Sequence, residues 1–397
     1  MKPLICLLFV WLASTNVSAQ ELLRTLEAHI IDKETGDPLP YASIYLRDGR
    51  GTITNSEGDF SLPVLSGDVD ITVSYVGYSS KTYPIDGVPE VIKLTPAVYQ
   101  LAEVLIVPID TKSIIEQIFN KNKKIVLDRK QPVYNFFYRQ TTRTNSVYNE
   151  IQEAYLSSTA ILCLRDLRLV HGRYAKLLSD SNNLYGNFRN FFTFSQASPI
   201  DPKRMDKNEK KFIMPLRANY EKYYDVSADV LDNGEGKLIY KLNFTPRAKV
   251  EDPILYGTIF VERSTLDILK YEVKTKNNYV LMKETKQDNN DISITVAYKI
   301  IEGKSIVESV HASNRIISDF EGKAYEFEIN SILFNVGLSS SKKGKKLAVK
   351  DGLLDRIRDT KYDPAFWNDN PIVKRTPLED EVIAMFEKDN LFTNYTE

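Results

Sequence analysis

Short alternating apolar runs, broken at close intervals by Gly, Pro, Asp and Asn, fill the stretch from residue 28 to residue 94. Between Ala42 and Leu46 the aliphatic side chains occupy every second position, which is the pattern of a half-buried strand. The turn Asn55-Ser-Glu-Gly58 ends in a glycine that is free to adopt a positive φ angle. Strands this short, with turns this frequent, predict a small seven-stranded-type β-sandwich over residues 20–95.

Residues 1–19 have the pattern of a secretory signal peptide. Lys2 provides a positive start, an apolar run follows from Leu4 to Leu12, and Val17-Ser-Ala19 places compact residues before Gln20. The apolar run is too short to span a bilayer of about 30 Å. We therefore expect an exported protein that has no transmembrane helix once the signal peptide is removed.

Several motifs of the first domain share their order and spacing with a known module. They are Ala28-His-Ile-Ile-Asp32, Thr35-Gly-Asp-Pro-Leu-Pro-Tyr-Ala-Ser-Ile44, Thr54-Asn-Ser-Glu-Gly-Asp-Phe60 and Ser74-Tyr-Val-Gly-Tyr78. Residues 27–95 thus resemble the carboxypeptidase D regulatory-like module, a transthyretin-like sandwich, although the family usually has Gly where this chain has Ala28. The resemblance implies a Gram-negative envelope protein, in the periplasm or associated with the outer membrane. The module by itself carries no zinc ligands.

A second, larger domain is predicted over residues 110–340, after a linker strand at 96–109. Asp110 precedes apolar residues at helical spacing, including Ile115 and Ile118, so we expect it to cap an amphipathic helix that packs on this domain. A helix lying on a membrane surface is the alternative. Tyr148–Leu164 is expected to form a strand pair.

From residue 223 to 336 the pattern is a β-meander. Asn233-Gly234 is its strongest hairpin signal, and charged residues such as Lys299 and Glu308 are expected on its exposed face. Consecutive hairpins of this length predict one large curved antiparallel sheet or an open barrel. The predicted strands are Tyr223–Leu231, Lys237–Phe244, Tyr256–Glu262, Ile268–Lys274, Ile292–Ile300, Ser305–Ala312 and Tyr325–Val336.

The tail, residues 341–397, is predicted to be a loop followed by a C-terminal helix. Thr376-Pro-Leu-Glu379 has the pattern of a capping box with proline at the first helical position. Asp363–Trp367 is expected to be a buried aromatic anchor on a loop. The whole chain is therefore predicted to be mainly β with helices, a β or α+β fold in which helices brace the second sheet.

The second region also resembles the uncharacterised Gram-negative envelope domain that often follows this module. The resemblance rests on residues 114–137, on the motif Tyr256-Gly-Thr-Ile-Phe-Val-Glu262 and on the tail from Asp363 to Phe386. The same strand motif recurs in lipoprotein-carrier folds, in which a curved sheet holds acyl chains.

Neither the motifs nor the charge of this chain point to a reaction. The net charge is −1, so no field of one sign exists to attract nucleic acid. His29, His171 and His311 lack the spacing of a zinc peptidase, and Gly-x-Ser-x-Gly and phosphate-loop motifs do not occur. Cys163 lies in an apolar string and is expected to be a buried structural thiol. We predict no catalytic residues, cofactor or metal, although a pair of carboxylates from the 53 acidic residues could still form a hydrolase site.

One aromatic segment is the candidate ligand contact. Aromatic side chains stack on sugars and pack against acyl chains, which makes a lipid or a glycan the candidate ligand. The alternative is that they cover the end of the sheet as core residues. The candidate residues are Tyr185, Phe188, Phe191, Phe192 and Phe194.

Three functions follow as hypotheses. The first is a non-catalytic exported envelope protein with a binding or assembly role, docking to an outer-membrane protein by strand addition at an open sheet edge. The second is a lipid or lipoprotein carrier with an apolar cavity. The third is a carboxylate-based hydrolase.

Overall fold

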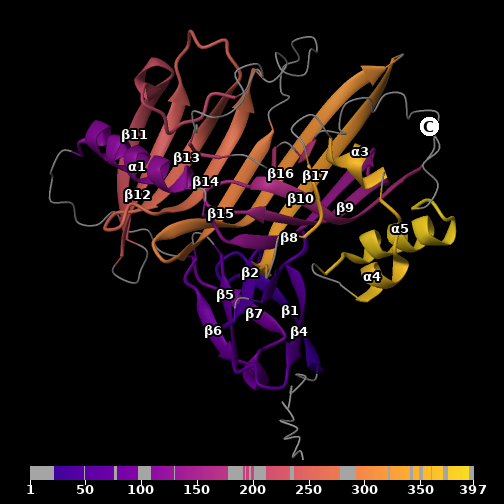
Figure 1. Cartoon of the computed structure of the whole chain (residues 1–397). Helices are drawn as coiled ribbons and strands as arrows, with labels where there is room; N and C mark the ends of the chain where they lie inside the picture. Colours follow the sequence, from indigo (N-terminus) through magenta and orange to yellow (C-terminus); the bar gives the residue numbers. More distant parts are fainter. Residues whose placement is uncertain are drawn as a thin grey trace, which may run out of the picture.

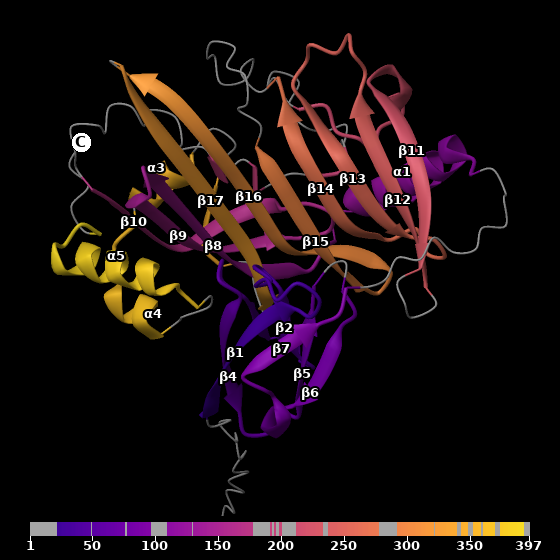
Figure 2. The same ribbon diagram turned by 180° about the vertical axis from the view of Figure 1, so that it is seen from behind.

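The structure, a computed structural model, shows a small β-sandwich and a large antiparallel sheet with a few helices (Figures 1 and 2). The mainly β fold predicted from the sequence is confirmed. The predicted signal peptide and most of the predicted linker strand lie outside the described residues. The structure describes residues 22–48, 50–75, 78–96, 109–128, 130–177, 191–192, 194–195, 198–200, 212–232, 237–277, 292–320, 322–339, 343–347, 352–358, 360–369 and 374–392.

The sandwich consists of two small sheets whose strand orders are β4-β1-β7 and β3-β2-β5-β6. Buried aliphatic and aromatic residues such as Ile30, Ile44 and Phe60 fill the space between them. Gly58 adopts the positive φ angle predicted for it, +85°, and a Cβ atom there would lie 2.7 Å from the carbonyl oxygen of Ile30. The elements are β1 (Leu22–Asp32), β2 (Ser43–Leu46), β3 (Gly51–Ile53), β4 (Asp59–Leu65), β5 (Asp70–Ser74), β6 (Lys81–Pro84), the 3-10 helix η1 (Ile85–Gly87) and β7 (Val91–Leu94).

The large sheet has 11 strands in the order β11-β12-β13-β14-β15-β16-β17-β8-β9-β10-β18. Strands that are adjacent in the sequence pair as hairpins. The pairing of β17 with β8 joins two groups of strands that are far apart in the sequence. Across the described residues the sheet is not closed into a barrel, because β11 and β18 are its two edges. The strands are β8 (Val133–Thr144), β9 (Val147–Thr159), β10 (Arg165–Lys176), β11 (Tyr224–Asp232), β12 (Leu238–Pro246), β13 (Ile254–Glu262), β14 (Ile268–Lys276), β15 (Ser293–Ile301), β16 (Lys304–Phe320), β17 (Lys323–Leu338) and β18 (Lys345–Lys346).

One face of this sheet is covered by the chain itself. Helix α1 (Thr111–Val126) lies across the strands near β11 and β12 (Figure 1) and buries Ile115 and Ile118 in the core, as predicted. Asp110 caps it by accepting a hydrogen bond from the backbone of Ser113. The 3-10 helix η4 (Tyr220–Lys222) and the helix α3 (Leu353–Arg358) add buried side chains to the same core. We call this covered side the inner face of the sheet.

Two local predictions were wrong. Tyr148–Leu164 is not a strand pair, because β9 runs unbroken to Thr159 and pairs with β8 and β10 on either side. The buried aromatic residue predicted at Asp363–Trp367 is present, since Trp367 is 3% exposed, but it lies on helix α4 (Pro364–Asp369), which Asp363 precedes, and not on a loop. Proline is favoured in the first turn of a helix, and the Asp363 carboxylate accepts a hydrogen bond from the Phe366 amide, so Asp363-Pro364 is a helix start.

The tail is more structured than the predicted loop and single helix. It contains α3, α4 and the C-terminal helix α5 (Pro377–Lys388), and it adds β18 to the sheet edge. The capping box predicted at the start of α5 is present, with reciprocal hydrogen bonds between Thr376 and Glu379.

The sandwich packs against the sheet on the face opposite to the inner face. Its residue Ile53 shares a buried cluster with Phe137, Phe334 and Trp367 from the sheet and the tail. The ring of Tyr41 stacks on that of His311 with 4.2 Å between the ring centroids. Figure 2 shows the sandwich beneath the middle of the sheet, near β8 and β17.

Candidate functional site

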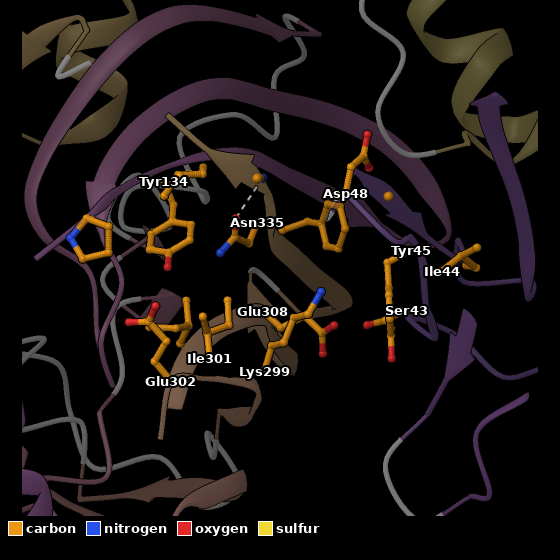
Figure 3. A pocket seen from close by; sticks show the side chains of 16 residues that line it. Ser43, Ile44, Tyr45, Asp48, Tyr134, Lys299, Ile301, Glu302, Glu308 and Asn335 are labelled. Carbon is orange, nitrogen blue, oxygen red and sulfur yellow. Dashed lines mark hydrogen bonds between the residues drawn. The ribbon is translucent and has the colours of Figure 1, made fainter. Parts of the chain in front are cut away.

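A cavity of about 490 Å³ lies at the joint between the sandwich and the large sheet. Three structural segments form it: the β2–β3 hairpin of the sandwich, the β15–β16 hairpin of the sheet, and the paired ends of β8 and β17. We call it the joint pocket (Figure 3). Its lining residues are Ser43, Ile44, Tyr45, Asp48, Gly51, Pro132, Tyr134, Lys299, Ile301, Glu302, Ile306, Glu308, Phe334, Asn335, Gly337 and Leu338.

A β-bulge at the end of β17 shapes one wall of this pocket. The pairing register with β8 shifts between Asn335 and Gly337, and Gly337 has a φ angle of +126° that a side chain would disfavour. The Asn335 side chain fixes the bulge, since it donates to the Val307 carbonyl at 2.9 Å and accepts from the Gly337 amide at 3.0 Å. The strand therefore bends at the point where it borders the pocket.

Two large aliphatic side chains of the lining are exposed to solvent. Leu338 is 69% exposed and Ile301 is 36% exposed, while Phe334 and Ile306, which also line the pocket, are buried. An exposed aliphatic residue is ordinary by itself, but a group of them beside a concave apolar surface is typical of a ligand site.

The charged residues of the pocket lie next to apolar ones, and Figure 3 shows Ile301 between Glu302 and Lys299. Figure 3 shows Lys299 and Glu308 side by side, with Tyr45 and Ser43 beyond them. The Lys299 ammonium lies 4.3 Å from the centre of the Tyr45 ring. Burial raises the pKa of Glu308, and both the charge of Lys299 and a hydrogen bond with Ser43 oppose that rise.

Two further carboxylates line the pocket. Asp48 accepts hydrogen bonds from the backbone and the side chain of Arg50; burial raises the pKa of Asp48, but the contacts with Arg50 outweigh it and the pKa is lowered. Glu302 is exposed in the β15–β16 turn, with a φ angle of +50°.

The predicted aromatic contacts are only partly described. Tyr185 and Phe188 lie outside the described residues. Phe191, Phe192 and Phe194 are buried in the core on the inner face, where the Phe192 ring meets that of Tyr138 edge-on at 4.8 Å. None of these three lines the joint pocket, so their contact with a ligand stays a prediction.

A buried cluster of charged residues, on the face of the large sheet opposite to the inner face, was not anticipated from the sequence. Glu153 on β9 accepts hydrogen bonds from the Nε atoms of Arg139 and Arg173, each at 2.6 Å. The guanidinium of Arg173 also lies 4.6 Å from the Trp367 ring centre and 4.7 Å from that of Phe392. These contacts attach the C-terminal helices to β8, β9 and β10. The only sequence signal was the presence of charged residues within apolar strands.

The histidines and the cysteine are dispersed. His29 pairs with Asp59 at 3.0 Å, His171 stacks on Phe366, and His311 stacks on Tyr41. Cys163 is buried, as predicted, and burial raises its pKa to about 11. Within the described residues, no three His, Cys, Asp or Glu side chains are grouped so that they could hold a metal ion. In the same part of the chain, the helices are too short or too polar to cross a membrane.

Comparison with known proteins identifies the first domain. Residues 27–106 match the family model of the CarboxypepD_reg-like domain, which confirms the resemblance seen at 27–95 and extends it by several residues. No curated protein matches the chain.

Three solved structures resemble part of the chain. They are a DUF1329 family protein from Desulfovibrio piger (11% identity, 57% of this chain and 94% of that one, TM-score 0.22), a LolA superfamily protein from Nitrosomonas europaea (13% identity, 61% and 98%, TM-score 0.24) and a structure on lipid–protein interactions in lipovitellin (12% identity, 65% and 31%, TM-score 0.23). At TM-scores this low, the likeness carries no inference about this chain.

Proposed function

We propose that this chain is a non-catalytic, exported binding protein whose ligand is a lipid-like amphipathic molecule held in the joint pocket. The observation that carries the proposal is the pairing of a 490 Å³ cavity with aliphatic side chains exposed at its lining. Cavities of about 300–1,000 Å³ with mostly apolar walls and a few polar groups are the usual form of small-molecule sites.

The sandwich gains a specific role in this proposal. It contributes Tyr45 and Asp48 to the pocket, and its contacts with the sheet through Ile53 and Tyr41 hold these residues in place. A ligand in the pocket would therefore touch both domains at once. Export is supported by the signal-peptide pattern of residues 1–19 and by the kind of module at 27–106, and the periplasm or the outer membrane is the proposed location.

The pocket chemistry favours binding over hydrolysis. A carboxylate-based hydrolase needs two carboxyl groups facing each other across the scissile bond, whereas the charged group that acts on Glu308 is Lys299. In the part of the chain that the structure describes, no histidine or cysteine lines the pocket to activate a nucleophile.

The position of the ligand differs from that expected of a carrier whose curved sheet holds the acyl chain. The inner face is packed with α1, α3 and aromatic side chains across the described residues, so we place the ligand at the joint. Strand addition at the β11 edge is less well supported, because Asp225 and Asp229 are exposed along it, and charged residues on an edge strand discourage pairing with another chain.

The proposal is tested by titrating the purified protein with the fluorescent apolar probe N-phenyl-1-naphthylamine. We expect saturable binding that Leu338→Glu weakens at least tenfold, because a charge then stands at the exposed apolar wall. Ile317→Glu is the matched control, since Ile317 is also an aliphatic strand residue, is 67% exposed, and does not line the pocket. Equal affinity of both variants and the unmodified protein would show that the joint pocket is not the binding site.

A further inference from the structure

We propose that the joint pocket selects amphipathic cations, that is, molecules with an apolar chain and a protonated amine. This inference rests on the proposed function, because it names the ligand class of the same pocket. The cavity and its exposed aliphatic residues define the site, and the charges and rings around it define which head group it accepts.

The charges of the lining are unequal. Three carboxylates, those of Asp48, Glu302 and Glu308, face the cavity together with one ammonium group, that of Lys299. Asp48 is paired with Arg50 and Glu308 lies beside Lys299, so the carboxylate of Glu302 leaves the site with an excess of negative charge. This charge attracts a ligand of opposite charge and repels a ligand of like charge, most strongly at low ionic strength.

The one positive group of the lining is already engaged. The Lys299 ammonium lies over the Tyr45 ring at 4.3 Å and acts electrostatically on Glu308. A fatty-acid carboxylate would have to draw Lys299 away from both partners, and it would then lie close to Glu308. The contacts of Lys299 with Tyr45 and Glu308 thus oppose the binding of an anionic head group.

The polar groups that remain suit an ammonium group. A carboxylate accepts hydrogen bonds from it, and the faces of aromatic rings attract it through their quadrupoles. Apart from the Tyr45 ring and Glu308, which Lys299 already engages, the pocket offers both, with Glu302 as an acceptor and Tyr134 and Phe334 as lining rings. The apolar chain of the ligand would lie against Ile301 and Leu338.

The test compares three probes that share one chain length and differ only in the head group: dodecylamine, dodecanol and dodecanoate. Each is titrated against the protein loaded with N-phenyl-1-naphthylamine, at pH 7.5, low ionic strength and concentrations below micelle formation. We expect dodecylamine to displace the dye with at least tenfold higher affinity than dodecanol, and dodecanoate to be the weakest of the three.

Two substitutions separate the head-group effect from the apolar effect. Glu308→Gln is expected to reduce the advantage of dodecylamine over dodecanol about tenfold while the affinity for dodecanol is kept. Lys299→Gln is expected to strengthen dodecylamine binding, because it removes the competing cation. Glu328→Gln is the matched control, since this strand glutamate pairs with Arg143 and does not line the pocket.

The outcomes distinguish the two proposals. If the dye does not bind, or binds equally to Leu338→Glu, the proposed function fails. If the dye binds in the pocket but dodecanoate or dodecanol displaces it best, the function stands and the selection of cations is overturned. Dodecanoate binding that Lys299→Gln abolishes would show that Lys299 is instead the anchor of an anionic head group.

Discussion

Replacing Glu153 with glutamine is expected to destabilise the protein by about 3 kcal/mol. Glu153 is 1% exposed, and its two oxygens accept the hydrogen bonds from Arg139 and Arg173. Burial raises its pKa, but the two guanidinium groups outweigh burial and lower the pKa from 4.5 to about 2. That difference corresponds to about 3 kcal/mol. It agrees with the roughly 3–5 kcal/mol lost when one partner of a buried ion pair is removed.

The pH dependence follows from the direction of this shift. Because the folded-state pKa of Glu153 is depressed, its contribution to stability is fully present above pH 4.5 and is lost as the pH falls towards 2. Glu153→Gln should therefore be less stable than the unmodified protein at pH 7. The difference between their free energies of unfolding should become smaller as the pH is lowered.

Urea unfolding measures this effect, with the fluorescence of Trp367 as the signal because its ring contacts Arg173. Glu328→Gln is the control, since Glu328 pairs with Arg143 at a partly exposed position, where the two side chains are 30% and 28% exposed, and solvent weakens such a pair relative to a buried one. A loss below about 1 kcal/mol for Glu153→Gln, or a loss equal to that of Glu328→Gln, would refute the role given to the buried charges.

Three further predictions concern buried residues and their packing. Burial lowers the pKa of His311 to about 4, so acidification from pH 7 to 4.5 should remove about 2 kcal/mol of stability through this group. Urea titrations should show a smaller loss in His311→Gln, and an unchanged loss would contradict this account. The buried Cys163 thiol should react with Ellman's reagent only when the protein unfolds, and rapid labelling of the native protein would disprove its burial. Gly172→Ala should cost about 1–3 kcal/mol, because the added Cβ would lie 2.6 Å from Ile357 Cγ1. Ile357→Ala removes Cγ1, so in thermal melts the double variant should lose less stability than the two single variants together, and simple additivity would contradict the clash.

The sequence predicted the strands of the meander well because each carries its own alternating pattern. Where the alternating pattern gave way to polar residues, the strand was predicted to end too early. The strand expected to end at Ala312 continues to Phe320, since pairing with β17 supports its exposed residues. The pairing of β17 with β8 has no local signal, because it depends on how the two runs meet in space.

The joint pocket could not be predicted for the same reason. Tyr45, Glu308 and Leu338 come from three distant segments, and each looks ordinary in its own strand. Lys299 and Glu308 were expected on an exposed face of the meander, but both border the pocket, where Lys299 lies over Tyr45 of the sandwich. Alternation shows that a side chain points away from the sheet's core, but not that a second domain covers that side.

Photo-crosslinking tests the central claim most directly. A dodecylamine that carries a diazirine at the end of its chain is bound to the purified protein and irradiated, and the labelled peptides are identified by mass spectrometry. We predict saturable labelling of the segments around Tyr45, Ile301 and Leu338 that line the joint pocket, with competition by unlabelled dodecylamine. Labelling concentrated on Phe191–Phe194 at the inner face, or labelling that does not saturate, would contradict a ligand site between the sandwich and the sheet.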